Sequence, residues 1–331
     1  HNFLVLTMGN CYNGMQKKAG VRFMFYFIVN PHARSGQGIN IWKKAEGFLA
    51  AEDTEYEVFF TKYTGHAREL ARQIAVLSLP CTLTVLGGDG TLNEVIDGLA
   101  SQGDFSHITL GYIPTGSGND FARGLGISSD VTACMRAILS PSAFALADVG
   151  VSRTSQGKRH FLVSSGIGYD ADICLGVMKT PAKKFLNRLR LGKLTYVYVA
   201  LKLLLKYQCC PVSVRIDKKE IYRLPRFYFL AAMNMKQEGG GVRFCPRARY
   251  QDGLLDICLV GDIPKAKILA LFPTAFFGKH TGFKGIHMYR CRRIDIISRD
   301  PLPIHCDGES MGYHRYLTIS DTQKQIKVIL K

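Results

Sequence analysis

The sequence lacks the short motifs that mark many metal-binding and secreted proteins. Its 10 cysteines form no C-x-x-C pair, so their spacing does not indicate a metal site. The apolar run at residues 3–6 is too short for a secretory signal, and no basic segment precedes it. These absences predict reduced thiols and a cytoplasmic location.

A membrane-spanning segment is also not indicated. The most apolar long stretch, residues 191–207, is interrupted by Lys193, Lys202 and Lys206, whereas a spanning helix needs about 20 mostly apolar residues. The chain starts at His1 rather than at methionine, so we set residues 1–20 aside as a leader or remnant.

Acidic residues are scarce relative to basic ones. The 26 Asp and Glu residues oppose 43 Lys and Arg residues, which gives a net charge of +17 at pH 7. This balance indicates a polyanionic neighbour, which is nucleic acid, an anionic membrane surface or a phosphorylated ligand. No helix-turn-helix, zinc finger or RNP-type aromatic strand accompanies the charge, so nucleic acid is the least favoured of the three.

The length of 331 residues exceeds what one hydrophobic core usually serves, which predicts two domains. In residues 21–147 strands are expected at 21–29, 56–60, 82–86 and 108–113, with helices at 39–51, 67–79 and 92–100. This alternation is typical of a mainly parallel sheet with helices on both faces, a three-layer α/β domain. Ligands of such sheets bind in the loops after the strands, here residues 30–38, 87–93 and 114–120.

Residues 148–318 have a different pattern, in which strands dominate. Six are expected, at 160–166, 211–216, 227–233, 254–260, 293–297 and 302–306, with helices at 185–207 and 264–272. The pattern predicts an antiparallel, β-sandwich-like second domain.

The three loops of the first domain are rich in glycine. Glycine lets the backbone approach a ligand and adopt positive φ, and the helix after residues 87–93 offers free N–H groups to an anion. Thr91 can cap that helix and donate to a phosphate, while Asp89 would repel the phosphate unless Mg²⁺ lies between them. One such loop could be an ordinary βα turn, but three on one sheet edge favour a nucleotide site. G-x-x-x-x-G-K-[ST] and G-x-G-x-x-G are absent, which disfavours P-loop NTPases and ordinary Rossmann dehydrogenases.

Several motifs in a fixed order carry a resemblance to a known family. They are GGDGTLN at residues 87–93, PTGSGNDFAR at 114–123, DGLLD at 252–256 and DGE at 307–309, after Asn30-Pro31 and Ser35-Gly36. Together they resemble the diacylglycerol kinase catalytic-domain family, and more narrowly its soluble bacterial lipid kinases, over about residues 22–320. GGDGT alone is shared with NAD kinases and sphingosine kinases, whereas the combination is specific.

The resemblance implies which residues bind ATP and metal. Those implied to contact the nucleotide are Asn30, Pro31, Ser35, Gly36, Thr61, Gly87, Gly88, Asp89, Gly90, Thr91, Leu92, Asn93 and Ser117. Ser117 stands where the family usually has threonine and keeps the hydroxyl. A structural Mg²⁺ is implied at Asp252 and the backbone carbonyls of Arg249 and Leu254, although Asp252-Gly253 alone could be an ordinary β-turn. Hard oxygen ligands of this kind suit Mg²⁺.

The resemblance also implies the catalytic carboxylates. Asp89 and Asp120 are expected to be the carboxylates on the catalytic Mg²⁺, either directly or through water. A lipid hydroxyl that attacks the γ-phosphate must lose its proton, and a nearby carboxylate can take it. The family places this general base in the triplet of residues 307–309, and the sequence leaves open whether Asp307 or Glu309 is the base. A strand near 326–330, within residues 319–331, is implied to return to the first domain.

Residues 179–207 carry eight basic and no acidic residues beside apolar positions at helical spacing. This indicates either a core-packing helix with a solvated basic face or an element that lies on an anionic membrane surface.

We therefore expect an ATP- and Mg²⁺-dependent lipid kinase with an active site between a nucleotide-binding and a lipid-binding domain. It is expected to act at the inner face of the membrane on diacylglycerol, giving phosphatidic acid. Sphingoid bases and phosphatidylglycerol are alternative acceptors. The sequence leaves open whether the protein forms a homodimer. NAD kinase lacks the GNDFAR and DGLLD pattern. A non-catalytic nucleotide-sensing or membrane-binding module would not need the carboxylates that this chain retains, Asp89, Asp120, Asp307 and Glu309.

Overall fold

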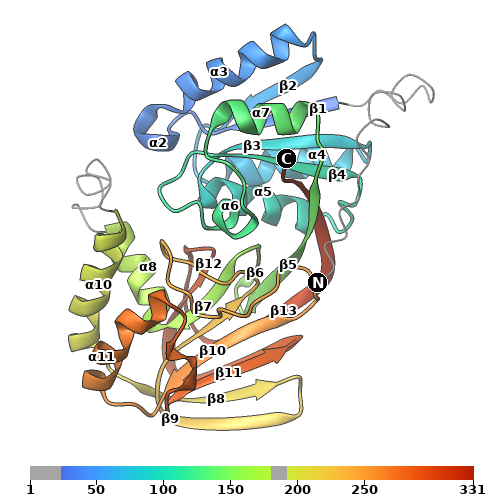
Figure 1. The fold of residues 1–331 in the computed structure, drawn as a ribbon. Coiled ribbons are helices and arrows are strands. Elements are labelled where there is room, and N and C mark those ends of the chain that lie inside the picture. Colours follow the sequence, from blue (N-terminus) through green and yellow to red (C-terminus); the bar gives the residue numbers. More distant parts are fainter. Residues whose placement is uncertain (1–23, 180–191) are drawn as a thin grey trace. The chain divides into compact units, whose positions relative to one another are not determined.

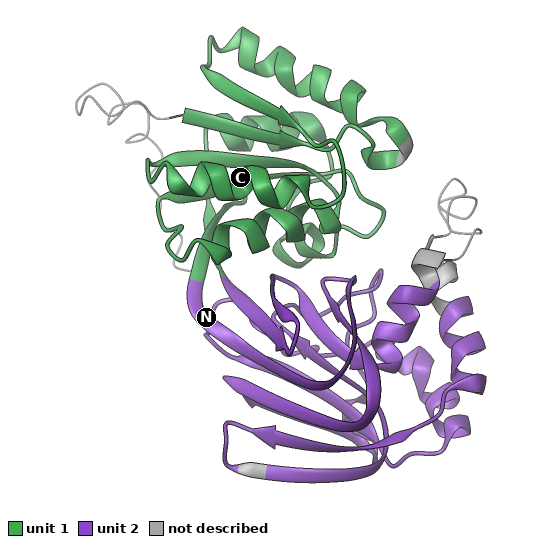
Figure 2. Ribbon diagram, turned by 180° about the vertical axis from the view of Figure 1, so that it is seen from behind, with its two compact units in different colours: residues 1–147, 325–331 green, residues 148–324 purple. Residues whose placement is uncertain are grey.

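The computed structural model describes residues 24–179 and 192–331, so the expected leader lies outside the described residues. The chain forms two compact units (Figure 2). Of the described residues, unit 1 contains 24–147 together with Gln325–Lys331, and unit 2 contains those within Asp148–Lys324. The segment that returns to unit 1 is therefore shorter than the expected 319–331.

A mainly parallel sheet forms the centre of unit 1 (Figure 1). Its strands, in order across the sheet, are β13 (Glu309–Ile329), β4 (Ile108–Pro114), β3 (Cys81–Gly87), β1 (Met24–Val29) and β2 (Tyr56–Phe60). β13 joins through a short parallel pairing in which Lys327 lies opposite Thr109. Every residue of β3 and β4 is buried, which explains why these strands are largely apolar rather than alternating.

Helices cover both faces of this sheet. On one face α3 (Gly38–Ala51) and α7 (Val131–Leu139) share an apolar cluster with Phe27 and Val29 of β1. On the other face α4 (His66–Val76) packs against α5 (Asp89–Ser101) so closely that a Cβ on Gly98 would lie 2.4 Å from the Arg68 carbonyl oxygen. The expected three-layer α/β domain is confirmed.

Unit 2 is mainly antiparallel. Its strands are β5 (Phe144–Thr154, which starts in unit 1), β6 (Gly157–Phe161), β7 (Ser164–Gly168), β8 (Cys210–Ile216), β9 (Glu220–Met233), β10 (Leu255–Gly261), β11 (Ile286–Cys291), β12 (Arg293–Cys306) and the first part of β13. They pair in the order β11-β10-β9-β7-β12-β13, while β8 pairs with both β9 and β12, and β5 pairs with β13 and β6.

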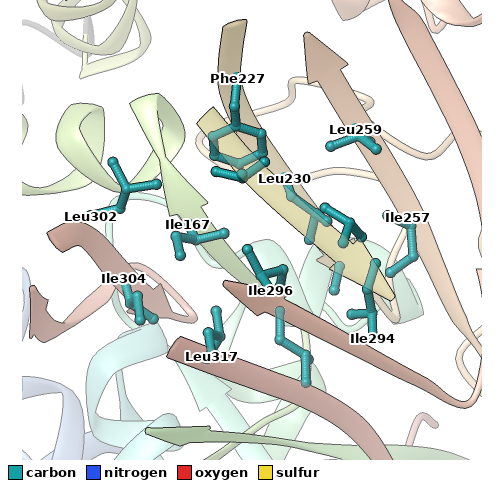
Figure 3. Close-up of a cluster of buried hydrophobic side chains, with 14 of the residues drawn as sticks. Ile167, Phe227, Leu230, Ile257, Leu259, Ile294, Ile296, Leu302, Ile304 and Leu317 are labelled. Carbon is teal, nitrogen blue, oxygen red and sulfur yellow. The ribbon is translucent and has the colours of Figure 1, made fainter. Parts of the chain in front are cut away.

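The two faces of β9 and β10 serve two different cores. Leu230 and Ile257 belong to a cluster with Ile294, Ile296 and other strand residues (Figure 3). Ala231 and Cys258, one position further along each strand, belong to a second cluster with α8 (Tyr169–Lys179), α10 (Gly192–Lys206) and α11 (Lys265–Phe276). Because successive side chains of a strand point to opposite faces, the helices cover one face and the sheet core fills the other.

Several expected boundaries in unit 2 are wrong. Residues 160–166 are not one strand, because the strand is interrupted at Leu162 and Val163, which form a bend between β6 and β7. Residues 293–297 and 302–306 form one strand, β12, with a register irregularity between Ile297 and Leu302. The strand expected near 326–330 is the end of the much longer β13.

The expected basic helix is described only in part, as α10, because residues 180–191 lie outside the described residues. Leu204 is buried, whereas Tyr198 and Leu205 are 57% and 76% exposed, so the predicted apolar stripe does not face the core as a whole. Within residues 24–179 and 192–331, no helix has both the length and the apolar character needed to cross a bilayer.

Candidate active site

The expected nucleotide loops meet at the carboxyl edge of the unit 1 sheet. The side-chain Nδ2 of Asn30, after β1, donates to Oγ1 of Thr91 at 3.1 Å and so ties the first loop to the start of α5. The backbone N–H of Thr61, after β2, donates to the Val29 carbonyl at 2.9 Å. The structure therefore brings Asn30, Thr61 and Thr91 together, although they are distant in sequence.

Glycines allow the loops after β3 and β4 to touch. A Cβ on Gly88 would lie 3.1 Å from the Cα of Gly116, and a Cβ on Gly87 would lie 2.6 Å from the Cβ of Thr91. Gly88 has φ −90° and ψ −176°, an extended conformation open to any residue, so the expected need for positive φ is wrong at this position. The close approach of two backbones is what requires glycine here.

Asp89 and Asp120 begin two helices and converge on the same place. A Cβ built on Gly118 would lie 2.9 Å from Oδ2 of Asp89 and 3.5 Å from Oδ2 of Asp120, which is the first residue of α6 (Asp120–Leu125). Burial raises the pKa of Tyr112 well above its ordinary value, and the charges of Asp89 and Asp120 raise it further. Two carboxylates that face one point form the oxygen-only donor set that Mg²⁺ prefers, so these residues fit the expected metal.

The remaining predicted nucleotide residues lie in the same loops with different exposure. Pro31 precedes α2 (Ala33–Gly36), and Gly36 ends this helix with φ +91°, which requires glycine. Ser117 is exposed, whereas Leu92 and Asn93 of α5 are buried. Ser35 lies in α2, and Gly90 lies in the first turn of α5, where backbone N–H groups have no intrahelical partner.

Two residues that the sequence analysis did not single out hold the loops in place. Asn119, with φ +51°, accepts from the Gly116 N–H at 2.8 Å and donates to the Gly116 carbonyl at 3.0 Å. Glu94 of α5 accepts from the Gly65 N–H at 2.7 Å and so fixes the loop that follows Thr61. Asn119 lies within the GNDFAR motif, but Glu94 has no sequence signal beyond its helical position.

In unit 2 the DGE triplet forms a tight hairpin turn between β12 and β13. Cys306 pairs with Glu309, and the two residues between them, Asp307 and Gly308, have φ +48° and +81°. Positive φ at both central residues, with the sequence Asp-Gly, is the signature of a type I′ turn. Glu309, the first residue of β13, is partly exposed.

The Asp307 carboxylate fixes a distant part of the chain. It accepts hydrogen bonds from the backbone N–H groups of Leu162 at 3.0 Å, Val163 at 2.9 Å and Ser164 at 2.9 Å. These hydrogen bonds hold the bend between β6 and β7 against the hairpin turn that contains Asp307. Asp307 therefore has an architectural task in addition to the catalytic one that the sequence suggests.

An apolar cavity in unit 2 was not foreseen from the sequence. It lies among α8, α11, β9 and β10, and its lining includes Ile173, Phe229, Ile268 and Phe272. Asp170 also lines it, and its Oδ2 lies 2.8 Å from Nε2 of the buried His305, two residues before Asp307. Only the spatial pairing of α8 with β12 reveals this connection, because Asp170 and His305 lie far apart in the sequence.

The predicted metal residue Asp252 lies in a turn lined by carboxylates. Its Oδ1 accepts from the Leu254 N–H at 3.2 Å, and its Oδ2 is paired with Arg290. Burial raises the pKa of Asp256 to about 6, opposed by Arg290 and reinforced by Asp252. Oδ2 of Asp256 is buried without a hydrogen-bond partner in the described residues. The Asp252 and Asp256 carboxylates are hard oxygen donors of the kind that Mg²⁺ prefers, and Arg290 pairs with both of them.

Comparison with known proteins gives the family. The diacylglycerol kinase catalytic domain matches residues 24–149, and the YegS C-terminal NAD kinase beta sandwich-like domain matches residues 168–321. The chain is 31% identical over 293 residues to YtlR of Bacillus subtilis, which is named as a lipid kinase, and the match covers 87% of this chain and 94% of YtlR. This chain belongs to the diacylglycerol kinase-like family of bacterial lipid kinases.

A second relative agrees with this assignment, and a solved structure shares the fold. A Bacillus subtilis protein named diacylglycerol kinase is 27% identical, and the match covers 86% of this chain and 89% of that protein. A crystal structure described as that of a diacylglycerol kinase from Bacillus anthracis has a TM-score of 0.74 at 23% identity, covering 95% of this chain and 99% of that one, which supports the fold. As a member of a lipid kinase family, the protein is a transferase with ATP as co-substrate.

Proposed function

We propose that the protein phosphorylates a neutral lipid alcohol with ATP, and that diacylglycerol is the acceptor and phosphatidic acid the product. The observation that carries this proposal is the apolar cavity of unit 2, whose wall reaches the DGE turn through Asp170 and His305. Its lining is almost wholly hydrocarbon, which favours the methylene groups of an acyl chain over a polar ligand. Its volume is about 60 Å³, so a whole acyl chain would enter only if the surrounding helices moved apart. NAD, the acceptor of the related NAD kinases, offers no comparable apolar group.

The charge of the cavity wall favours a neutral headgroup. Asp170 is the one acidic residue among the described residues that line the cavity, and its carboxylate is engaged by His305. A sphingoid base would bring an ammonium group that needs an available carboxylate as its partner. Diacylglycerol needs none, so it fits this wall better.

Residues of unit 1 and residues of the DGE turn would each supply part of the phosphate-transfer chemistry. The loops that contain Asn30, Gly88 and Ser117 would hold the ATP phosphates, with backbone N–H groups at the start of α5 as donors. Mg²⁺ held by Asp89 and Asp120 would neutralise the charge that develops on the transferred phosphoryl group. We propose that the general base is Asp307 or Glu309, which would accept the proton of the lipid hydroxyl.

The exposed face of α10 supports action at an anionic membrane surface. Tyr198, Leu201 and Leu205 are exposed there beside Lys202 and Lys206. Exposed apolar side chains can enter the headgroup region while each nearby lysine gains roughly 1 kcal/mol from anionic lipid. Leu205→Glu should therefore weaken binding to vesicles that contain phosphatidylglycerol. As a control, Val76→Glu places the same charge on an exposed apolar site of α4 in unit 1.

A lipid panel tests the proposed reaction. The protein is incubated with γ-labelled ATP, Mg²⁺ and mixed vesicles that contain dioleoylglycerol, phosphatidylglycerol or sphingosine, with NAD as a soluble alternative. We expect dioleoylglycerol to be phosphorylated fastest. Faster transfer to sphingosine or NAD would refute the diacylglycerol assignment, and nucleotide binding without transfer to any acceptor would indicate a non-catalytic module.

Filling the cavity provides a second test of the same proposal. Ile268→Trp adds bulk at a residue that lines the cavity, so KM for the lipid should rise by about tenfold while KM for ATP stays constant, which is the signature of lost acceptor binding. Leu269→Trp is the matched control, because Leu269 is the next residue of the same helix and is 48% exposed. Equal effects of the two substitutions on lipid KM would refute the role of the cavity.

A further inference from the structure

His305 makes two contacts that link the cavity wall to the DGE turn. The ring is 1% exposed, and its Nε2 lies 2.8 Å from Oδ2 of Asp170 on α8. Its Nδ1 accepts a hydrogen bond from the backbone N–H of Gly308 at 3.2 Å. One imidazole thus connects a residue that lines the acceptor cavity with the central glycine of the catalytic turn.

The two contacts select one form of the ring. The Gly308 N–H is a donor, so Nδ1 must present a lone pair, and the ring proton must then lie on Nε2 and point to Asp170. Burial lowers the pKa of His305, while the Asp170, Glu238 and Asp307 carboxylates act in the opposite direction and raise it. The Gly308 bond opposes that rise, because a protonated Nδ1 would face the Gly308 N–H. The neutral ring is the form that makes both bonds.

A glycine on the neighbouring strand leaves room for the contact between Asp170 and His305. Gly166 of β7 lies opposite His305 in the pairing of β7 with β12. A Cβ on Gly166 would lie 2.4 Å from Oδ2 of Asp170 and 2.4 Å from Nε2 of His305. No side chain can occupy that position while the pair is in place, so the neighbouring strand is built around the contact between Asp170 and His305.

We propose that His305, oriented by Asp170, is a positioning residue that holds the Asp307-Gly308-Glu309 turn in the geometry required for phosphoryl transfer. The inference rests on the proposed lipid kinase activity and adds a residue outside the DGE motif to it. The Asp307 carboxylate restrains the turn through the bend between β6 and β7, and His305 restrains it through Gly308. Misplacement of a catalytic group by about 1 Å can cost roughly 100-fold in rate, so the second restraint matters for kcat.

Two substitutions separate the two contacts. In His305→Asn the side-chain oxygen can take the place of Nδ1 and accept from Gly308, while the bond to Asp170 is lost. In His305→Gln the side-chain nitrogen can take the place of Nε2 and donate to Asp170, while the bond to Gly308 is lost. We expect His305→Gln to lower kcat at least about tenfold with KM for ATP unchanged, and His305→Asn to retain most of kcat. His314→Gln is the control, because His314 is also buried and bonds a backbone carbonyl, that of Met311.

The acceptor in this assay is whichever lipid of the panel the parent phosphorylates fastest. A parent that prefers another lipid therefore refutes the diacylglycerol assignment and leaves the His305 comparison intact. Equal kcat losses in the Asn and Gln variants, or none in the Gln variant, would overturn the proposal. NMR of the parent labelled with ¹⁵N at histidine gives a readout independent of folding defects in the variants and of activity. We expect the His305 signals of a neutral ring protonated at Nε2, and a ring protonated at Nδ1 would overturn the proposal.

Discussion

The contact between Gly88 and Gly116 offers the most direct test of the nucleotide site. A Cβ at residue 88 would lie 3.1 Å from the Gly116 Cα, whereas ordinary contacts of this kind are 3.4 Å or longer. Alanine therefore requires the loops after β3 and β4 to separate by about 0.3 Å, which is the difference between these two distances. Valine carries two further methyl groups and requires a larger separation.

The separation should act on ATP before it acts on the fold. The loop after β3 leads into α5, whose first N–H groups are proposed to bind the phosphates, and each hydrogen bond to a charged group contributes about 1.5–3 kcal/mol. Loss of one such bond lowers affinity by roughly 10- to 100-fold. We therefore expect Gly88→Val to abolish measurable ATP binding at moderate concentrations, and Gly88→Ala to weaken it less.

Calorimetric titration with ATP and thermal unfolding together measure both effects. Gly47→Ala is the control, because Gly47 lies inside α3 and a Cβ there meets nothing within 4 Å. That change should leave ATP affinity unaltered and raise stability by about 0.5–1 kcal/mol, since alanine is the better helix former. An affinity of Gly88→Val within about threefold of the parent, a loss below ~0.7 kcal/mol, would refute the phosphate-loop assignment.

Three further predictions follow from unit 2. Asp252→Ala should remove the part of the Mg²⁺-dependent rise in melting temperature that comes from this turn, measured without nucleotide. Arg290→Gln should enlarge that part, because Arg290 competes for the same carboxylate. Equal shifts in all three proteins would exclude Mg²⁺ from this turn. Asp307→Asn and Glu309→Gln should both slow single-turnover phosphoryl transfer, by roughly 10²–10⁴-fold for the residue that is the general base. Only Asp307→Asn should also lower the melting temperature, because the Asp307 carboxylate accepts hydrogen bonds from three backbone N–H groups. Parental rates in both variants would exclude the triplet from the mechanism. Burial raises the pKa of Asp172 to about 6, so ionisation of this carboxyl lowers the stability of the fold progressively between about pH 4 and pH 6. Asp172→Asn should therefore stabilise the protein by about 1–3 kcal/mol at pH 8 but not at pH 4. Denaturant unfolding at both pH values measures this difference.

The fold of unit 1 could be predicted because its signals are local. Strand β2 begins and ends at the expected residues 56 and 60, and β3 and β4 extend the expected ranges by one or two residues. Buried parallel strands are largely apolar along their length, and the glycine loops mark where each one ends. The expected positive φ at Gly88 failed because a sequence shows that glycine is present but not whether the cause is backbone conformation or close packing.

In unit 2 the errors arise where distant residues decide local structure. Leu162 and Val163 look like the middle of a strand, but their N–H groups are turned to the carboxylate of Asp307. The sequence pattern did not predict helix α8. The contact of Asp170 with His305 depends on that helix, so it was not predicted either. Neither contact follows from periodicity, because each joins residues more than 130 positions apart.

The route of β13 has a consequence for how the protein is made on the ribosome. The strand starts beside the DGE turn in unit 2, and only residues after Lys324 belong to unit 1, where Lys327 lies opposite Thr109 and the Lys331 carbonyl accepts from the Ser142 and Ala143 N–H groups. Until these residues have been translated, β4 is an open edge of the sheet, and exposed strand edges invite pairing with other chains. Unit 1, although synthesised first, is thus completed last. A chain that ends at Lys324 and is released from the ribosome should carry a complete unit 2 and an aggregation-prone unit 1.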